Sequence, residues 1–234
     1  MDSIRNGHRE RLRSRYLYSG ENGLPDYDML ELLLTYAIQR RDVKPVAREL
    51  MERFHNLCGV LDAGPDELCK VPGIGKNSAL LISLIRTLCT RYLQNNLSGK
   101  SVLSNPEAVR NYVRMRLLMY ENEVFLLIYL DVRHQIIKTE IFDRGTVDTI
   151  VLHPKMIAEE ALIHKAADLI VAHNHPAGTM APSASDRDFT RKLQRSLEFL
   201  EIHLLDHLIV SRSGIYSFLD HNLLEERYDY RYRK

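Results

Sequence analysis

The sequence predicts an α+β protein in which an all-helical first part is followed by a second part of mixed strands and helices. Residues 1–100 show helical spacing of apolar side chains and no strand pattern. From Gln94 the composition changes to polar and small residues, which indicates a linker. Beyond it, Val124–Leu130 is a continuous apolar run typical of a buried strand, and further strands alternate with helical segments.

These observations divide the chain into four segments. A helical domain is expected over residues 1–95, a linker over 96–105, a mixed α/β domain over 106–224, and a basic, aromatic and frayed tail over 225–234. The full length of 234 residues is sufficient for one large or two small domains with real cores.

The periodicity predicts the individual elements. In the first domain, helices are expected over 4–18, 28–38, 43–54, 57–62, 65–70 and 77–93. In the second domain, helices are expected over 106–119, 154–167 and 185–200. Strands are expected over 124–130, 134–142, 168–173, 202–211 and 215–219.

Charge and cysteine content limit the classes of partner and compartment. The net charge is +1, so bulk electrostatics predict no polyanionic partner. Three cysteines without a Cys-x-x-Cys spacing argue against disulfides, and we expect all three to be small buried side chains: Cys58, Cys69 and Cys89. The N-terminus has no apolar signal core, and no apolar run reaches the length of a membrane span. A cytoplasmic protein without a membrane partner is expected.

The segment from His173 to Asp186 has the residue types of a metal site. It follows the apolar run Leu169–Ala172, and alternation along a strand puts His173 and His175 on one face. Two imidazoles and a carboxylate are ligands that zinc takes, and three protein ligands leave a fourth position for water, as in catalytic sites. In the alternative interpretation both histidines are polar loop residues, and Ser183 and Asp186 only cap the next helix.

This pattern resembles the JAB/MPN (JAMM) metallohydrolase signature, which is His-x-His, seven residues, then Ser-x-x-Asp. Neighbouring segments are similar to the RadC-like branch of that superfamily: His173–Gly178, Asp206–His207 and Ser217–Phe218. The resemblance is strong over residues 101–224. It implies a cytidine-deaminase-like domain, a zinc cofactor, and hydrolysis of a peptide or isopeptide-like amide bond. In eukaryotic relatives of the family the substrate is a ubiquitin-type conjugate.

The resemblance also implies roles for two further residues. In that family a glutamate at the start of the domain's first strand acts as the base, which corresponds here to Glu123, with Glu121 as the alternative on the same strand face. Ser183 corresponds to the residue that stabilises the tetrahedral oxyanion, and it is also a suitable helix N-cap. A competing capping register, Ser185 with Asp188, would free Ser183 for chemistry.

Other histidines are weaker candidates. His203 and His207 are expected on one face of a strand with Asp206 on the other, where they either orient a ligand histidine or form a structural pair. His153 precedes Pro154 at the expected start of a helix. The family resemblance alone implies that His153 lies near the site.

The first domain contains a segment that resembles a helix-hairpin-helix, Leu68–Leu81. Gly73 and Gly75 would allow the turn to adopt backbone angles that other residues disfavour. Lys76 adds positive charge beside backbone N–H groups that can face a phosphate. Such a hairpin binds DNA without reading its sequence. The five arginines between Arg5 and Arg15 form either a second phosphate-binding face or the solvated side of a helix.

Two functions from different classes follow. The first is a zinc-dependent hydrolase of the metallopeptidase or isopeptidase type. The alternative is a DNA-associated repair or recombination accessory protein that binds DNA non-specifically. A zinc deaminase is excluded, because none of the cysteines follows the His173–His175 motif.

Overall fold

A computed structural model describes residues 2–143, 152–176 and 178–225. It comprises two compact units, Met1–Cys89 and Thr90–Lys234. The first is helical and the second contains a mixed five-stranded sheet with helices, so the predicted α+β class is confirmed. Almost all of the expected tail lies outside the described residues.

Six helices and a 3-10 turn make up the helical part, and the last helix crosses the division between the units. They are α1 (Asp2–Ser19), η1 (Gly20–Gly23), α2 (Asp26–Ala37), α3 (Lys44–Phe54), α4 (Leu57–Asp62), α5 (Pro65–Cys69) and α6 (Lys76–Leu97). The main core is formed by apolar sides of α2 to α6, with Leu34, Leu50 and Leu68 fully buried. Leu12 of α1 packs in a smaller cluster with Leu24 and Leu32. Helix α6 continues past residue 93 through part of the expected linker, and Gly99, with a φ of 69°, follows its end.

Two expectations for the helical unit need correction or refinement. All three cysteines are exposed. Cys58 and Cys69 lie in the short helices α4 and α5, whose buried positions are occupied by Val60 and Leu68, and Cys89 lies on an exposed position of α6. Two of the N-terminal arginines are engaged within the unit: Arg9 donates to the carbonyl of Ile38, and Arg15 donates to Asp28. These guanidinium groups therefore stabilise the packing of α1 against its neighbours.

The second unit continues with η2 (Val102–Ser104), α7 (Pro106–Leu117), β1 (Val124–Leu130), β2 (Ile136–Asp143), α8 (Pro154–Ile163), β3 (Asp168–Asn174), α9 (Ala184–Glu198), β4 (His203–Ser211) and β5 (Gly214–Ser217). The strand order is β2-β1-β3-β4-β5, and only β3 and β4 are parallel. Parallel pairing of β3 with β4 requires a crossover connection between them, and that connection contains α9.

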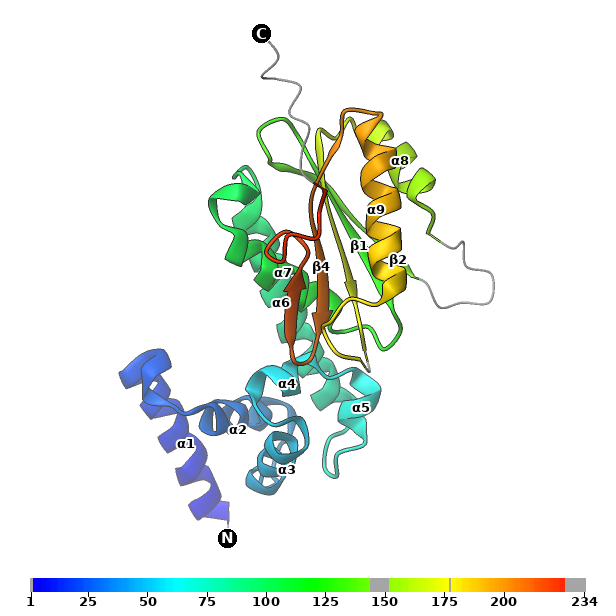
Figure 1. Ribbon diagram of the computed structural model, residues 1–234. Helices are drawn as coiled ribbons and strands as arrows, with labels where there is room; N and C mark the ends of the chain where they lie inside the picture. The colour runs from blue at the N-terminus through cyan, green and yellow to red at the C-terminus, as the bar shows by residue number, and fades with distance from the viewer. Residues whose placement is uncertain (1, 144–151, 177, 226–234) are drawn as a thin grey trace. The chain divides into compact units, whose positions relative to one another are not determined.

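Helices cover both faces of the sheet, with α7 on one side and α8 and α9 on the other (Figure 1). Because side chains alternate along a strand, even-numbered residues of β1 and β3 such as Leu126 and Ala172 pack on the α7 side. Odd-numbered residues such as Leu127 and Val171 pack toward α8 and α9. Because both faces of β1 are buried, its sequence is an uninterrupted run of apolar residues.

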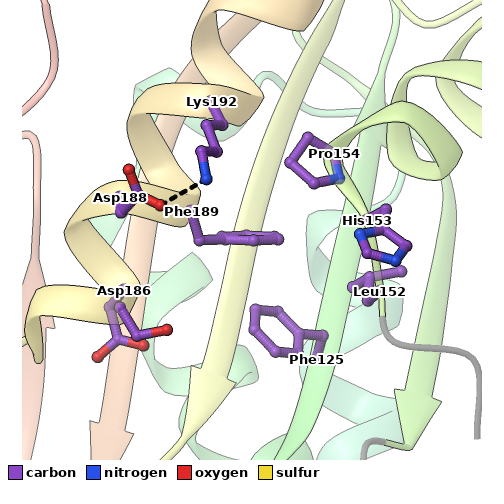
Figure 2. A pocket seen from close by; sticks show the side chains of 9 residues that line it. Phe125, Leu152, His153, Pro154, Asp186, Asp188, Phe189 and Lys192 are labelled. Carbon is purple, nitrogen blue, oxygen red and sulfur yellow. Dashed lines mark ion pairs between the residues drawn. The ribbon is translucent and has the colours of Figure 1, made fainter.

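On the α8/α9 side, a cavity of about 210 Å³ lies between Phe125 of β1, the start of α8 and the first turns of α9 (Figure 2). Within the part of the chain that the structure describes, no helix is both long enough and apolar enough to cross a membrane.

Candidate metal centre

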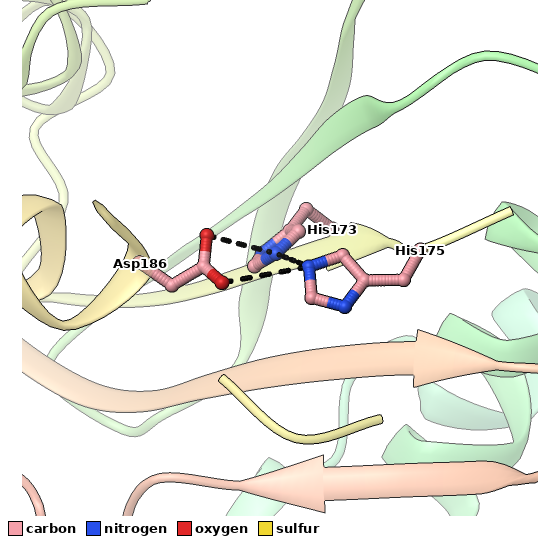
Figure 3. A group of neighbouring side chains, drawn as sticks. All are labelled: His173, His175 and Asp186. Atoms are coloured by element: carbon pink, nitrogen blue, oxygen red, sulfur yellow. Dashed lines mark hydrogen bonds and ion pairs between the residues drawn. The ribbon is translucent and has the colours of Figure 1, made fainter. Parts of the chain in front are cut away.

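Three potential metal ligands converge at the end of β3 (Figure 3). His173 Nε2 lies 3.4 Å from one carboxylate oxygen of Asp186, and His175 Nε2 lies 3.5 Å from the other. The two Nε2 atoms are 3.0 Å apart. The side chain of His173 is fully buried and that of His175 is 18% exposed, so one side of the group remains open to solvent.

The local sequence explains how Asp186 reaches the histidines. Ser183 is the N-cap of α9, and it forms a capping box with Asp186. The Ser183 hydroxyl accepts a hydrogen bond from the backbone N–H of Asp186, while the Asp186 carboxylate accepts from both the backbone N–H and the hydroxyl of Ser183. The alternative register with Ser185 and Asp188 is wrong, because the helix already begins at Ala184.

Hydrogen bonds to the second ring nitrogens fix the tautomers of both histidines. His175 Nδ1 lies 2.8 Å from the carbonyl oxygen of Thr179, which can only accept, so Nδ1 carries the proton. His173 Nδ1 lies 2.8 Å from His207 Nε2. The direction of that hydrogen bond follows from Thr190, which contacts the other ring nitrogen of His207.

Thr190 has a single hydroxyl proton. Its Oγ1 donates that proton to the backbone carbonyl of Asp186, and it lies 2.6 Å from His207 Nδ1. His207 Nδ1 must therefore be the donor to Thr190, which leaves His207 Nε2 as an acceptor and His173 Nδ1 as a donor. His207 is neutral in this arrangement, in agreement with burial and the neighbouring His173, which lower the pKa of His207 well below its usual value.

The resulting donor set fits a zinc ion. Both Nε2 atoms are left with lone pairs, and these face each other and the Asp186 carboxylate across 3.0–3.5 Å. These electron-rich atoms repel one another at such distances, and a cation bound between them would remove the repulsion. Zinc ligands at about 2.0–2.1 Å in a tetrahedron lie about 3.3 Å from one another.

The carboxylate is also kept in the form that binds a metal. Burial raises the pKa of Asp186, but the two hydrogen bonds that its carboxylate accepts from Ser183 act in the opposite direction, and the net effect holds that pKa well below its usual range. Asp186 is therefore ionised throughout the physiological pH range.

A second group of potential ligands, Glu140, Glu160 and His164, lies between β2 and α8. Here the Lys138 ammonium pairs with Glu140 and lies 3.1 Å from His164 Nε2. The lysine already supplies the positive charge, so we assign no metal to this group.

A β-bulge overturns the expectation that His203 and His207 share a face. The β3–β4 register pairs Leu169 with Leu204 but Ile170 with Asp206, so one residue of β4 is skipped. His203 consequently contacts Asp168 at the far end of β3, while His207 contacts the ligand His173. His207 is thus the histidine that orients the candidate ligand His173.

Asp206 holds the chain that follows β4. Its carboxylate accepts hydrogen bonds from the Ser217 hydroxyl and from the backbone N–H groups of Leu219 and His207. Burial raises the pKa of Asp206 despite these bonds. The Asp206–His207 pair therefore combines a structural residue with one that supports the site.

Asn174, the middle residue of the His-Asn-His motif, has a role that the sequence did not reveal. Its amide nitrogen donates to the carbonyls of Tyr120 and Asn122, and its oxygen accepts from the backbone N–H of Val124. Alternation along β3 turns this side chain away from the ligands, and there it fixes the segment that carries Glu123.

Glu123 immediately precedes β1 and is partly buried, whereas Glu121 is exposed. Both lie before the strand, which begins at Val124, so the expectation that they share a strand face is wrong. Phe125 pairs with His173 across the β1–β3 ladder, and continuation of this register places Glu123 opposite His175. His153 is the N-cap of α8 and lines the cavity rather than joining the three ligands.

The predicted hairpin joins α5 to α6, and its two glycines differ. Gly73 has a φ of 92°, and a Cβ there would meet Val46 Cγ2 at 2.7 Å, so glycine is required. Gly75 has no positive φ, and a Cβ there would meet open space, so the expectation of a special backbone angle at Gly75 is wrong. Lys76 is exposed at the first residue of α6.

Replacing His207 by Ala is expected to lower zinc affinity by about 10- to 100-fold, because His173 would lose the partner that fixes its tautomer and ring orientation. Competition with a chromophoric zinc chelator measures the affinity. His203→Ala is the matched control on the same strand and should leave the affinity unchanged. Equal affinities in the two variants would show that the contact between His207 and His173 does not support the site.

Comparisons with known proteins identify the family to which the chain belongs. A family model described as RadC-like JAB domain matches residues 103–223, and one described as UPF0758 N-terminal matches residues 6–80. A UPF0758 protein of Fusobacterium nucleatum is 34% identical over 225 residues, which cover 93% of this chain and 97% of the relative. Another from Paraburkholderia phytofirmans is 39% identical over 206 residues, covering 88% of this chain and 80% of the relative. The chain therefore belongs to the RadC-like JAB family and carries a UPF0758 N-terminal domain.

Proposed function

We propose that this protein is a zinc-dependent hydrolase that cleaves a peptide or isopeptide amide bond. The observation that carries the proposal is the convergence of His173, His175 and Asp186 with both histidine Nε2 atoms left unprotonated by their hydrogen bonds. Three protein ligands with an open side favour a catalytic site over a closed structural one.

Residues of the chain itself would carry out the proton transfers and stabilise the oxyanion. Zinc, when bound, would lower the pKa of a water molecule from about 15.7 toward about 7. Glu123, opposite His175 in the continued register, receives the proton of that water and delivers it to the leaving amine. Ser183, whose hydroxyl donates to Asp186, can turn its proton toward the oxyanion that forms at the cleaved carbonyl.

Hydrolysis assays on the zinc-loaded full chain test this proposal. Peptides, isopeptide-linked conjugates and duplex DNA are offered in parallel, with and without a zinc chelator. Amide cleavage that stops on chelation and returns with added zinc is expected. Cleavage of DNA without any amide hydrolysis would contradict the proposal.

Weak, non-specific DNA binding through the α5–α6 hairpin is a second candidate function. The observation that favours it is the sharp turn at Gly73, which exposes Lys70 and Lys76 beside the start of α6. Backbone N–H groups at a helix start and flanking lysines suit a phosphate. This function is independent of the metal centre.

Lys76→Glu is expected to weaken duplex binding and to reduce its salt dependence, since binding of this kind depends on phosphate contacts. Gly75→Val tests the close approach of the backbone without disturbing the fold, because a Cβ there meets open space, whereas Gly73 must stay unchanged. Fluorescence anisotropy at several salt concentrations measures both. Lys100→Glu, another exposed lysine, is the matched control. The hairpin is excluded if Lys76→Glu and Gly75→Val both bind DNA like the unaltered protein.

A further inference from the structure

The cavity between β1, α8 and α9 is contiguous with the metal centre. Asp186 is both a metal ligand and part of the cavity wall (Figure 2). Phe125, another wall residue, stacks on the ring of the ligand His173, with ring centroids 5.0 Å apart. A group held in this cavity would therefore lie directly beside an amide bond presented to the zinc.

The volume of the cavity limits the size of its occupant. At about 210 Å³ it is smaller than the roughly 300–1,000 Å³ of typical small-molecule sites. It is suited to one amino-acid side chain.

The chemistry of the walls limits the type of side chain. Phe125 and Phe189 present tilted rings with centroids 5.2 Å apart, and Leu152 and Pro154 extend this apolar part of the wall. The rest of the wall is polar and is formed by His153, Ser185 and the charged residues of α9. Tilted aromatic rings favour a further aromatic partner in an edge-to-face contact.

The charged groups of the wall are already engaged. At the rim, the Lys192 ammonium pairs with Asp188 at 2.8 Å, and both side chains are more than half exposed. Asp186 is held by Ser183 and belongs to the metal centre. No unbalanced charge of this wall therefore selects an acidic or basic side chain.

We infer that this cavity is the specificity subsite of the enzyme and that it takes a large apolar side chain, preferably aromatic, from a residue that flanks the cleaved amide bond. The inference rests on the proposed zinc hydrolase function. It adds a substrate class: peptides or isopeptides with Phe-like or Leu-like residues next to the scissile bond.

Binding of zinc-chelating hydroxamates to the zinc-loaded full chain tests the inference without requiring turnover. Two series are used, with the side chain on the carbon next to the hydroxamate or one carbon further, so that either flank of the bond is represented. In each series the side chain corresponds to Gly, Leu, Phe, Glu or Lys. Isothermal titration calorimetry gives the dissociation constants.

In at least one series, the Phe and Leu compounds are expected to bind about 10- to 200-fold more tightly than the Gly compound, as is usual for filling an apolar pocket. The Glu and Lys compounds should gain nothing. Ser185 lines the cavity and is exposed in the first turn of α9, so Ser185→Leu fills the space from the outside. This variant should lose the preference and keep both its zinc and its affinity for the Gly compound.

Ser196→Leu makes the same change later in α9, away from the cavity, and should keep the preference. Equal binding of the Gly and Phe compounds in both series, or a preference that survives in Ser185→Leu, would overturn the inference. Failure of the hydrolase proposal has a different signature, because amide substrates would then remain uncleaved while the hydroxamate ranking persists. If no hydroxamate binds at all, both the subsite inference and the hydrolase proposal are refuted.

Discussion

Replacing Glu123 by Gln is expected to slow amide hydrolysis by about 10²- to 10⁴-fold, the usual contribution of a general base. Glutamine keeps the shape and hydrogen-bonding capacity of the side chain but cannot accept the proton of the metal-bound water. The zinc content should stay unchanged, because Glu123 is not among the three converging ligands. Turnover of a fluorogenic peptide and elemental analysis of the same preparation measure the two quantities.

Glu121→Gln is the matched control, since Glu121 is exposed and lies two residues earlier in the same bend. It should retain activity. If Glu121→Gln is inactive and Glu123→Gln is active, the base has been assigned to the wrong glutamate. Loss of zinc from Glu123→Gln would make this residue a ligand and change the coordination that we propose.

His175→Ala and Asp186→Ala are each expected to reduce the zinc content from about one ion per chain to a small fraction of that value. Each variant leaves only two of the three protein ligands, and Asp186→Ala also removes the acceptor of the capping box. Elemental analysis of protein purified without chelator measures the content. The unaltered protein should also lose zinc on acidification, because the ligands bind a metal only in their deprotonated forms and metal binding therefore releases protons.

His203→Ala removes a histidine of the same unit that contacts Asp168 rather than the ligands, so it should keep its zinc. Full zinc content in both His175→Ala and Asp186→Ala would refute the assigned site. Circular dichroism distinguishes loss of the ion from loss of the fold, which matters most for the capping residue Asp186.

The regular elements were predictable because their apolar spacing directly reflects burial. The run Val124–Leu130 could be assigned to a strand covered on both faces, and the structure shows that every residue of β1 is buried. The His173–Asp186 spacing predicted convergence of three ligands because strand alternation and a capping box are both local geometries. Local rules therefore sufficed for these features.

Features that depend on a partner strand or on packing could not be predicted in this way. The bulge that separates His203 from His207 exists only in the pairing of β4 with β3. The roles of Thr190 and Asn174 depend on contacts with residues distant in sequence, namely His207 and the 120–124 segment. The burial of Cys58 and Cys69 was predicted wrongly because neighbouring apolar residues, not cysteines, occupy the few inward-facing positions of α4 and α5.

The three hydrogen bonds of Asn174 also explain why the two histidines must be separated by one residue. The strand presents the two candidate metal ligands on one side and its anchor for the Glu123 segment on the other, so the separation between the proposed ion and the proposed base is set within three consecutive residues. Insertion or deletion of a single residue would exchange the two sides of the strand beyond it. The number of residues in this segment is therefore constrained by the separation between the candidate ligands and Glu123. We expect changes of side chains elsewhere in the chain to disturb this separation less than an insertion or deletion here.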